Sequence, residues 1–361
     1  MNNRFPTDFD PSLPLERASA LAADWYVEPS VFEKELKRVF EKEWHWAGRL
    51  DQLQKPGSWL VTQVGKESVV VTRDIEGRLN AFSNVCRHRA ARVCRKSEGQ
   101  STRLKCQYHG WTYDLAGNLK TTPEFDGVID FTKEEQALPQ FQVKVHGPWV
   151  FVCLSPEPPS FENQWAPLLQ ATSAAALDGL VFSRRVEYPL QCNWKVFVDN
   201  YLDGGYHINT LHPDLAGVIP YAQYRSEVFA RSSLQSAPLK PASGAGVSQV
   251  RKGSAQYWWI YPNLMINIYD DTMDVNVVIP EGPHRCKVLF DFYFSRELEQ
   301  QPHLIEASLK VAHQVQLEDQ DICEEVQKGL ESSFYRSGRF SVSREQTAYH
   351  FHQLIAGALL S

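Results

Sequence analysis

Cys86-Arg87-His88 and, after seventeen further residues, Cys106-Gln107-Tyr108-His109-Gly110-Trp111 form the stretch from which the rest of this sequence is best interpreted. Each half offers one thiolate and one imidazole, two residues apart in the first half and three apart in the second. The four side chains therefore make two mixed pairs of metal ligands. Gly110 allows the backbone to turn tightly after His109, as expected of a loop that holds a metal between short strands.

The mixture of ligands separates two kinds of metal centre. A structural zinc usually has Cys paired with Cys at C-x(2-4)-C spacing and His paired with His at H-x(3-5)-H spacing. If Cys86 and Cys106 instead hold one iron while His88 and His109 hold another, the centre is a 2Fe-2S cluster of Rieske type. Such a cluster accepts electrons and passes them on. The mixed pairs favour the cluster, with structural zinc as the alternative.

Length and composition bound the class of protein. The chain has 361 residues, of which 43% are hydrophobic, enough for a large core and about two domains. Apolar runs stay short of a membrane span, and the start of the chain has the features of neither a signal peptide nor a transit peptide. We therefore expect a cytoplasmic protein with no membrane partner. The net charge of -6 argues against a nucleic-acid partner, and seven cysteines without framework spacing indicate reduced thiols.

Three parts follow one another along the chain. Residues 1–46 are expected to form a helical segment that packs on the C-terminal domain, with a helix over 29–46 capped by Ser30. Short β-rich runs broken by glycines predict an antiparallel β domain over 47–156, which carries the cluster ligands. Prolines near residue 156 indicate the passage to a third part, residues 157–361.

The third part mixes helices and long strands. A helical, Ala-rich piece is expected around 165–177, and 256–279 and 286–294 are expected to be strands of a sheet under the helices. Residues 237–253 contain Pro, Gly and Ser without periodicity, which indicates a mobile loop or, alternatively, a lid over a pocket.

His207 and His212 are the first residues of a second constellation. A spacing of five puts them about 140° apart on a regular helix, too far round to face one metal. A local π-like turn or a helix end would bring them together. Pro213 disfavours helical geometry at His212, so we expect the helix to end there. The alternative is two unrelated polar histidines.

A third ligand comes from a later helix, 311–330. Its apolar positions form one stripe that consists of Val311, Val315, Ile322, Val326 and Leu330. Asp319 falls inside that stripe, Glu318 at its edge as the weaker candidate, and Asp321 well outside it. A buried carboxylate needs a partner. Two imidazoles and one carboxylate form the facial triad of mononuclear non-haem iron, which leaves positions open for dioxygen and substrate.

An electron-storing cluster and an oxygen-binding iron in one chain imply reductive activation of dioxygen. Over essentially its full length the chain resembles the terminal oxygenases of the Rieske non-haem iron family, and most closely the plant choline monooxygenases and their bacterial relatives. The segments that carry the resemblance are 199–207, 261–267 and 318–332.

The resemblance implies an α+β fold in which a Rieske β-sandwich domain precedes a helix-grip catalytic domain. It also implies a homotrimer in which the cluster of one subunit feeds the Fe(II) of its neighbour. Electrons would come from NAD(P)H through a separate reductase or ferredoxin, since no flavin or nicotinamide fingerprint occurs in the sequence.

One departure from the family concerns the acid that bridges the two centres. Many members have it three residues before the first histidine ligand, where this chain has Gly204. Asp203 or Asp199 is therefore expected to take this role through a hydrogen bond to an imidazole, and the alternative is an acid on a helix surface. Asn200, in the same segment, is a further catalytic candidate.

Aromatic residues near the triad suggest the substrate. Those expected to contact it are Tyr201, Tyr206, Trp258, Trp259 and Tyr261, with Tyr257 and Tyr269 nearby. Aromatic faces attract quaternary ammonium groups by about 0.5–2 kcal/mol per contact, although Trp and Tyr on strands are also ordinary core residues.

Three functions are therefore distinguished. The first is monooxygenation or N-demethylation of choline, a betaine or another methylated amine. The second is hydroxylation of an aromatic ring or another neutral substrate, which needs the same metal ligands and a different pocket. The third is electron transfer by a Rieske protein without catalysis, against which His207, His212 and Asp319 argue.

Overall fold

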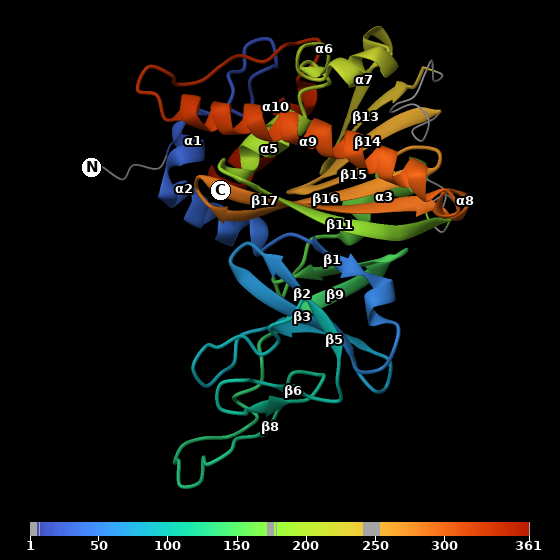
Figure 1. The fold of residues 1–361 in the computed structure, drawn as a ribbon. Coiled ribbons are helices and arrows are strands. Elements are labelled where there is room, and N and C mark those ends of the chain that lie inside the picture. The colour runs from blue at the N-terminus through green and yellow to red at the C-terminus, as the bar shows by residue number, and fades with distance from the viewer. Residues whose placement is uncertain (1–5, 7, 172–176, 178, 241–252, 361) are drawn as a thin grey trace. The chain divides into compact units, whose positions relative to one another are not determined.

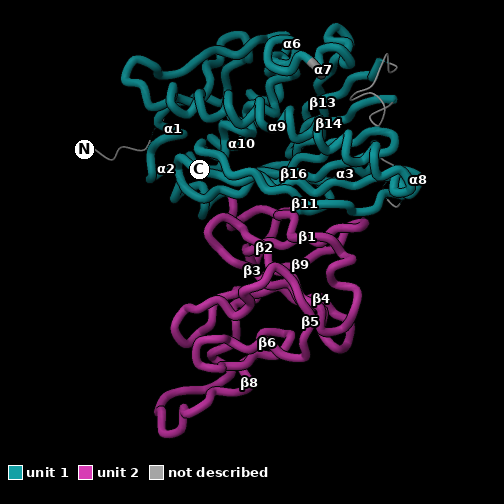
Figure 2. Tube along the Cα trace, viewed as in Figure 1, with its two compact units in different colours: residues 1–39, 160–361 teal, residues 40–159 magenta. Residues whose placement is uncertain are grey.

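The computed structural model describes residues 6, 8–171, 177, 179–240 and 253–360. The chain forms two compact units, one of residues 1–39 and 160–361 and the other of residues 40–159 (Figures 1 and 2). We call them the first unit and the second unit. The chain passes between the units at 39/40 and 159/160, where the sequence-based boundaries were 46/47 and 156/157. None of the described helices is long and apolar enough to cross a bilayer.

The second unit is built from antiparallel strands. A seven-stranded sheet has the order β1-β10-β9-β4-β3-β2-β5, and a three-stranded sheet has the order β6-β7-β8. The strands are β1 His45–Arg49, β2 Ser58–Val64, β3 Glu67–Arg73, β4 Leu79–Ser83, β5 Glu98–Gln100, β6 Leu104–Lys105, β7 Thr112–Tyr113, β8 Leu119–Thr121, β9 Gln140–His146 and β10 Trp149–Cys153. The predicted antiparallel β domain is confirmed, and the loops β4–β5 and β6–β7 carry the Cys and His residues.

The first unit contains a seven-stranded antiparallel sheet of order β11-β17-β16-β15-β14-β13-β12. Its strands are β11 Leu180–Leu190, β12 Arg225–Phe229, β13 Ser232–Pro238, β14 Ser254–Ile260, β15 Leu264–Ile268, β16 Thr272–Gly282 and β17 Arg285–Ser295. The sheet strands predicted over 256–279 and 286–294 are therefore confirmed, although 256–279 holds parts of three strands, β14, β15 and β16, joined by two short turns.

Helices cover this sheet. They are α1 Asp24–Val27, α2 Pro29–Glu35, α3 Phe161–Ala171, α5 Trp194–Tyr201, α6 Ile208–Leu211, α7 Pro213–Val218, α8 Arg296–Glu299, α9 Pro302–Leu330 and α10 Gln346–Leu360. The central helix α5 packs against β16, β17 and α9 (Figure 1). The chain thus has the α+β fold that was expected, with one β unit and one unit in which an antiparallel sheet packs against helices.

Local expectations were wrong at three places. The helix predicted over 29–46 ends earlier, because α2 continues only as a π-helix over Leu36–Phe40 and β1 begins at His45. Glu28 rather than Ser30 is its N-cap, since Pro29 occupies the first helical position. β13 extends to Pro238, so the loop predicted from residue 237 starts later, and residues 241–252 of it lie outside the described residues.

The buried side of α9 also differs from the predicted apolar stripe. Ile322 and Val326 are 37% and 44% exposed, whereas polar Gln316 and Gln327 are buried. The polar residues are buried because this side of the helix faces the candidate site and the start of α5, where Gln327 accepts a hydrogen bond from the Asn193 backbone N–H. A prediction from hydrophobicity alone does not identify a helix side that is buried through polar residues.

A buried ion pair attaches α5 to the N-terminal helices. Lys195 Nζ lies 2.5 Å from Glu35 Oε1, and both side chains are fully buried. Trp194 Nε1 donates to the second oxygen of Glu35, and Lys195 Nζ also donates to Asn193 Oδ1. Burial lowers the pKa of Lys195 and raises that of Glu35, and each partner's charge opposes the effect on the other.

We expect Lys195→Met to destabilise the first unit by about 3–5 kcal/mol, because it leaves the Glu35 carboxylate buried without its cation. Guanidinium unfolding followed by tryptophan fluorescence measures this loss. Lys287→Met is the matched control, since Lys287 and Glu187 form a partly exposed pair. Its effect should stay below about 1 kcal/mol. Equal effects of the two substitutions would contradict a structural role for the buried pair.

Candidate metal centres

Two loops of the second unit have the same backbone design. In the first, Cys86 N–H donates to the Ala91 carbonyl and Ala90 N–H donates to the Cys86 carbonyl. In the second, Cys106 N–H donates to the Trp111 carbonyl and Gly110 N–H donates to the Cys106 carbonyl. The fifth residue of each loop has a positive φ, 56° at Ala90 and 75° at Gly110. Each cysteine therefore begins an equivalent tight turn that presents its own sulfur and the histidine that follows.

The four predicted cluster ligands come together. His88 Nδ1 and His109 Nδ1 are 3.0 Å apart, and their rings meet edge to face. Cys86 and Cys106 are buried and belong to the same cluster of core side chains. His109 is exposed and His88 partly exposed. Two sulfurs on the inside and two Nδ1 atoms on the outside suit a cluster with one iron held by thiolates and the other by imidazoles.

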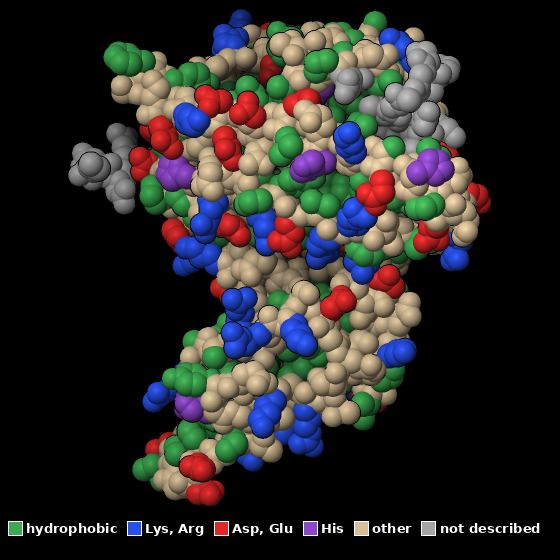
Figure 3. Space-filling view, viewed as in Figure 1, with side chains coloured by type: hydrophobic (Ala, Val, Ile, Leu, Met, Phe, Trp, Pro, Cys, Tyr) green, Lys and Arg blue, Asp and Glu red, His purple; other side chains and the backbone are tan. Residues whose placement is uncertain are grey.

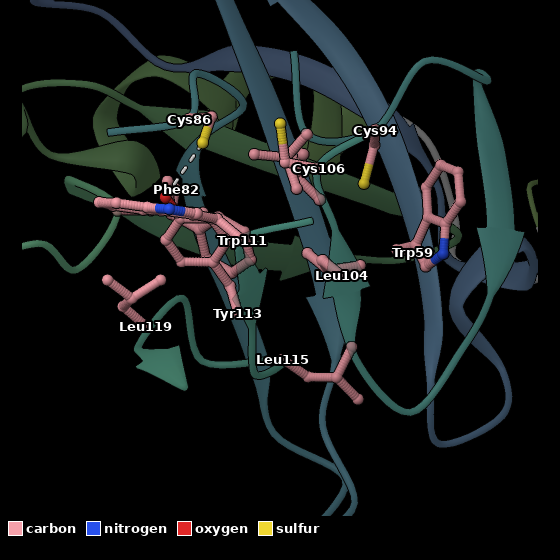
Figure 4. Close-up of a cluster of buried hydrophobic side chains, with 13 residues drawn as sticks. Trp59, Phe82, Cys86, Cys94, Leu104, Cys106, Trp111, Tyr113, Leu115 and Leu119 are labelled. Carbon is pink, nitrogen blue, oxygen red and sulfur yellow. Dashed lines mark hydrogen bonds between the residues drawn. The ribbon is translucent and has the colours of Figure 1, made fainter. Parts of the chain in front are cut away.

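The surroundings of the thiols support this arrangement. Cys86 and Cys106 belong to a buried cluster with Trp59, Phe82, Cys94, Leu104, Trp111, Tyr113, Leu115 and Leu119 among its members (Figure 4). Tyr113 Oη lies 3.4 Å from Cys86 Sγ and accepts a hydrogen bond from the Arg87 N–H. Burial raises the pKa of Tyr113, so its hydroxyl stays protonated and can donate to a thiolate. Burial also raises the pKa of Cys94 to about 12, as befits a core thiol.

The second constellation is assembled by a chain reversal after α5. Gly204 and Gly205 have φ values of 70° and 71°. A Cβ on Gly204 would collide with the Arg344 carbonyl, so only glycine fits there. After this reversal His207 precedes α6, and His212 lies between α6 and α7. The prediction of a helix end at His212 is confirmed, and this end turns both imidazoles toward α9.

His207, His212 and Asp319 form a group that could hold a metal ion. One ligand atom from each lies within 4.8 Å of the others. His212 Nε2 is 3.1 Å and His207 Nε2 is 3.9 Å from Asp319 Oδ1. Two imidazole nitrogens and one carboxylate oxygen are the ligand types of a non-haem iron site. Such a site leaves further coordination positions open.

Each of the two histidines is oriented by a further hydrogen bond. His207 Nδ1 donates to Asp203 Oδ2 over 2.5 Å, and His212 Nδ1 donates to Glu318 Oε2 over 2.7 Å. Both Nε2 atoms are thereby left to face the shared space. Burial would lower the pKa of His212, but hydrogen bonds and charges of Asp319 and Glu318 outweigh burial and raise it.

The remaining catalytic candidates, Asn200 and Asp199, have different surroundings. Asn200 Nδ2 donates to Asp319 Oδ1 over 2.7 Å, so Asn200 is part of the site. Asp199 points elsewhere, because it accepts hydrogen bonds from Tyr26 Oη and His352 Nε2 at 2.6 and 2.8 Å. Of the two acids named as bridging candidates, Asp203 is the one that contacts a triad imidazole.

A cavity of about 120 Å³ adjoins the triad. Its described lining includes the aromatic residues Phe197, Tyr201, Tyr224, Tyr257, Tyr269 and Phe290, and the polar residues Asn200, Asp203, Gln235, Asn267, Asp274, Asn276 and Gln316. Only one of the five residues expected to contact a substrate, Tyr201, is among them. Its hydroxyl donates to Asn267 Oδ1 over 2.8 Å.

The other four residues expected to contact a substrate do not line this cavity. Tyr206 is 56% exposed, outside the lining. Trp258 stacks on Phe229, whereas Trp259 packs against Phe351 and Tyr261. Trp258, Trp259 and Tyr261 are buried core residues, the alternative that the sequence left open. Tyr224 and the polar lining of β15 and β16 were missed, because alternation along a strand does not tell which of its two faces lines a cavity.

Comparisons with known proteins agree with this geometry. The family described as Rieske [2Fe-2S] domain matches residues 43–141, and the family described as ring hydroxylating alpha subunit (catalytic domain) matches residues 177–361. The first match supports the iron–sulfur cluster over structural zinc. The second covers the two histidines and Asp319.

Individual relatives match almost the whole chain. Chloroplastic choline monooxygenase of Arabidopsis thaliana is 37% identical, over 98% of this chain and 86% of its own. The carnitine monooxygenase oxygenase subunit of Acinetobacter pittii is 28% identical, over 91% and 90%. Among solved structures, a quaternary ammonium Rieske monooxygenase described with carnitine oxidation and inter-subunit electron transfer superposes with a TM-score of 0.85. It is 26% identical, over 98% of this chain and 99% of its own.

Together, the paired Cys-His loops, the triad and these matches show that the chain belongs to the alpha subunits of the Rieske ring-hydroxylating oxygenases and is an oxygenase of the monooxygenase class.

Proposed function

We propose that this oxygenase hydroxylates a small quaternary or methylated amine, such as choline or a betaine. The observation that carries the proposal is the aromatic wall of the cavity beside the triad, to which Tyr201, Tyr224, Tyr257 and Tyr269 contribute. Aromatic faces attract a trimethylammonium group by about 0.5–2 kcal/mol each. The named activities of the relatives, on choline and on carnitine, support the same substrate class.

The chain's own residues prepare the site for this reaction. Asp203 and Glu318 fix the ring orientation of His207 and His212, and Asn200 holds Asp319. A mononuclear iron bound by the triad would supply dioxygen activation, and the 2Fe-2S cluster would supply electrons. Asp203 is proposed as the acid that couples the two centres, because it already contacts the His207 imidazole.

Partners and compartment follow from further features. We propose that electrons come from NAD(P)H through a separate reductase or ferredoxin, which is consistent with a relative that is named an oxygenase subunit. We also propose a homotrimer in which the cluster of one copy serves the iron of another, as the inter-subunit electron transfer described for one relative suggests. Seven free thiols suit a reducing compartment such as the cytoplasm.

The proposed function is tested by substrate-dependent oxygen uptake with an added reductase. Choline, glycine betaine and carnitine should stimulate uptake, and small aromatic acids should not. Formaldehyde release would identify N-demethylation, whereas an aldehyde product would identify hydroxylation of the carbinol carbon. Uptake with aromatic acids alone would replace the proposed substrate class by a neutral or aromatic one.

Metal analysis should find about three irons and two acid-labile sulfides per chain, because the sequence offers one cluster site and one mononuclear site. The dithionite-reduced protein should give an electron paramagnetic resonance signal of Rieske type, with a low average g. Zinc in place of iron would contradict both site assignments.

His207→Ala should preserve the visible spectrum of the cluster and reduce oxygen uptake to background, because the imidazole belongs to the triad and not to the cluster. His303→Ala is the matched control, since His303 is exposed at the start of α9. Full activity of the His207 variant would show that the triad is wrongly assigned.

Tyr113→Phe should lower the reduction potential of the cluster, because it removes a hydrogen bond to the Cys86 sulfur. One hydrogen bond of about 1 kcal/mol corresponds to about 40 mV for one electron. Spectroelectrochemical titration measures the shift. Tyr108→Phe, which removes an exposed hydroxyl beside the same cluster, should leave the potential within error of the wild type.

A further inference from the structure

One row of side chains runs across the sheet of the first unit and forms one wall of the cavity. Gln235 on β13 is paired with Tyr257 on β14, Tyr257 with Asn267 on β15, and Asn267 with Asp274 on β16. Directly paired residues point to the same face of a sheet, and all four line the cavity. The row therefore places the Asp274 carboxylate next to aromatic and amide groups inside the cavity.

Two amides hold the Asp274 carboxylate in place. Asn267 Nδ2 and Asn276 Nδ2 both donate to Asp274 Oδ1, over 2.8 and 2.9 Å. Asn267 in turn accepts a hydrogen bond from Tyr201 Oη. Asp274 is 4% exposed and Asn276 is 2% exposed. The acid is thus a fixed feature of the cavity wall rather than a side chain that can turn toward solvent.

Asn276 also contributes an oxygen, Oδ1, that accepts no hydrogen bond from the described residues. Its Nδ2 must face the carboxylate, which accepts and cannot donate, so the orientation of the amide is settled. Its Oδ1 is then buried with no hydrogen-bond partner in the described part of the chain. A trimethylammonium group has no N–H, and its polarised methyl C–H groups are suitable partners for such an oxygen.

The lining offers acidic side chains to a substrate, of which Asp203 and Asp319 belong to the metal site and Asp274 does not. Asp203, Asp274 and Asp319 line the cavity, and none of its described lining residues is Lys or Arg. Choline carries one positive charge and a neutral hydroxyl. Glycine betaine and carnitine carry a carboxylate as well, and the described lining offers it no Lys or Arg as a partner. Gln316 Nε2, a buried donor without a hydrogen-bond partner in the described residues, also lines the cavity and suits a hydroxyl oxygen.

We propose that Asp274, positioned by Asn267 and Asn276, selects a cationic amino alcohol of the choline type over zwitterionic betaines. This inference rests on the proposed function, since it specifies which quaternary amine the same site accepts. Asp274 acts as a specificity-determining residue through its charge, and the aromatic wall attracts the ammonium group in either kind of substrate.

The test compares four ligands that differ in charge: choline, glycine betaine, L-carnitine and 3,3-dimethyl-1-butanol, the neutral carbon analogue of choline. Binding is measured by isothermal titration calorimetry on the air-oxidised holoenzyme without reductase, where no turnover occurs, and kcat and KM are measured separately by oxygen uptake. The wild type should bind choline at least tenfold more tightly than the other three. Equal binding of choline and glycine betaine would overturn the proposal without any substitution.

Asp274→Asn keeps the shape of the side chain and removes its charge. It should weaken choline binding by about 30-fold, as expected when one partner of a buried charge pair is removed, and leave binding of 3,3-dimethyl-1-butanol unchanged. The matched control is Glu281→Gln, which removes an exposed carboxylate from the same strand. An equal loss for all four ligands would show that Asp274 acts only on structure and would overturn its role in selection.

These outcomes are separate from failure of the proposed function. If none of the three quaternary amines supports oxygen uptake in the wild type, the substrate class itself is wrong. If all three support it with similar kcat/KM and the Asp274 variant does not change their ratio, the substrate class stands and the selection by charge is overturned.

Discussion

The hydrogen bond from Asn200 to Asp319 joins the two helices on which the candidate iron site depends. Helix α5 supplies Asn200 and leads into the glycine reversal before His207, while α9 supplies Asp319 and Glu318. The buried Lys195–Glu35 pair fixes the start of α5 and the sheet supports its side. A metal site tolerates little movement of its ligands. The position of α5 therefore determines how well the three candidate ligands are placed around a metal ion.

Sequence reasoning succeeded where spacing alone determines the chemistry. The two Cys-His pairs and the His207-His212 pair come from short segments, in which a local turn decides how the side chains meet. Asp319 was found because an acid within an apolar stripe needs a partner, even though the stripe itself was placed partly on the exposed side of α9. The free-energy cost of burying an unpaired carboxylate therefore identified Asp319 more reliably than the apolar stripe identified the buried side of the helix.

The cavity wall could not be found in the same way. Trp258 and Tyr257 are neighbours in sequence but lie on opposite faces of β14, and composition gives no reason to choose between them. Asp274 follows Asp270 and Asp271 and resembles part of a turn. Only the register between β15 and β16, which pairs Asp274 with Asn267, places this acid in the cavity. Pairing between distant strands is a property of the folded sheet.

The loops that carry the cluster ligands are rich in exposed positive charge, which makes interactions at this surface sensitive to ionic strength. Seven exposed cationic residues lie between the first and last cluster ligands: Arg87, Arg89, Arg92, Arg95, Lys96, Arg103 and Lys105. Figure 3 shows Lys and Arg side chains at the surface of the second unit. Exposed charges are screened within about 8 Å at physiological ionic strength, whereas charges in a buried cavity are screened much less. Rising ionic strength should therefore weaken the attraction of these residues for any acidic partner, while charge interactions inside the cavity change much less.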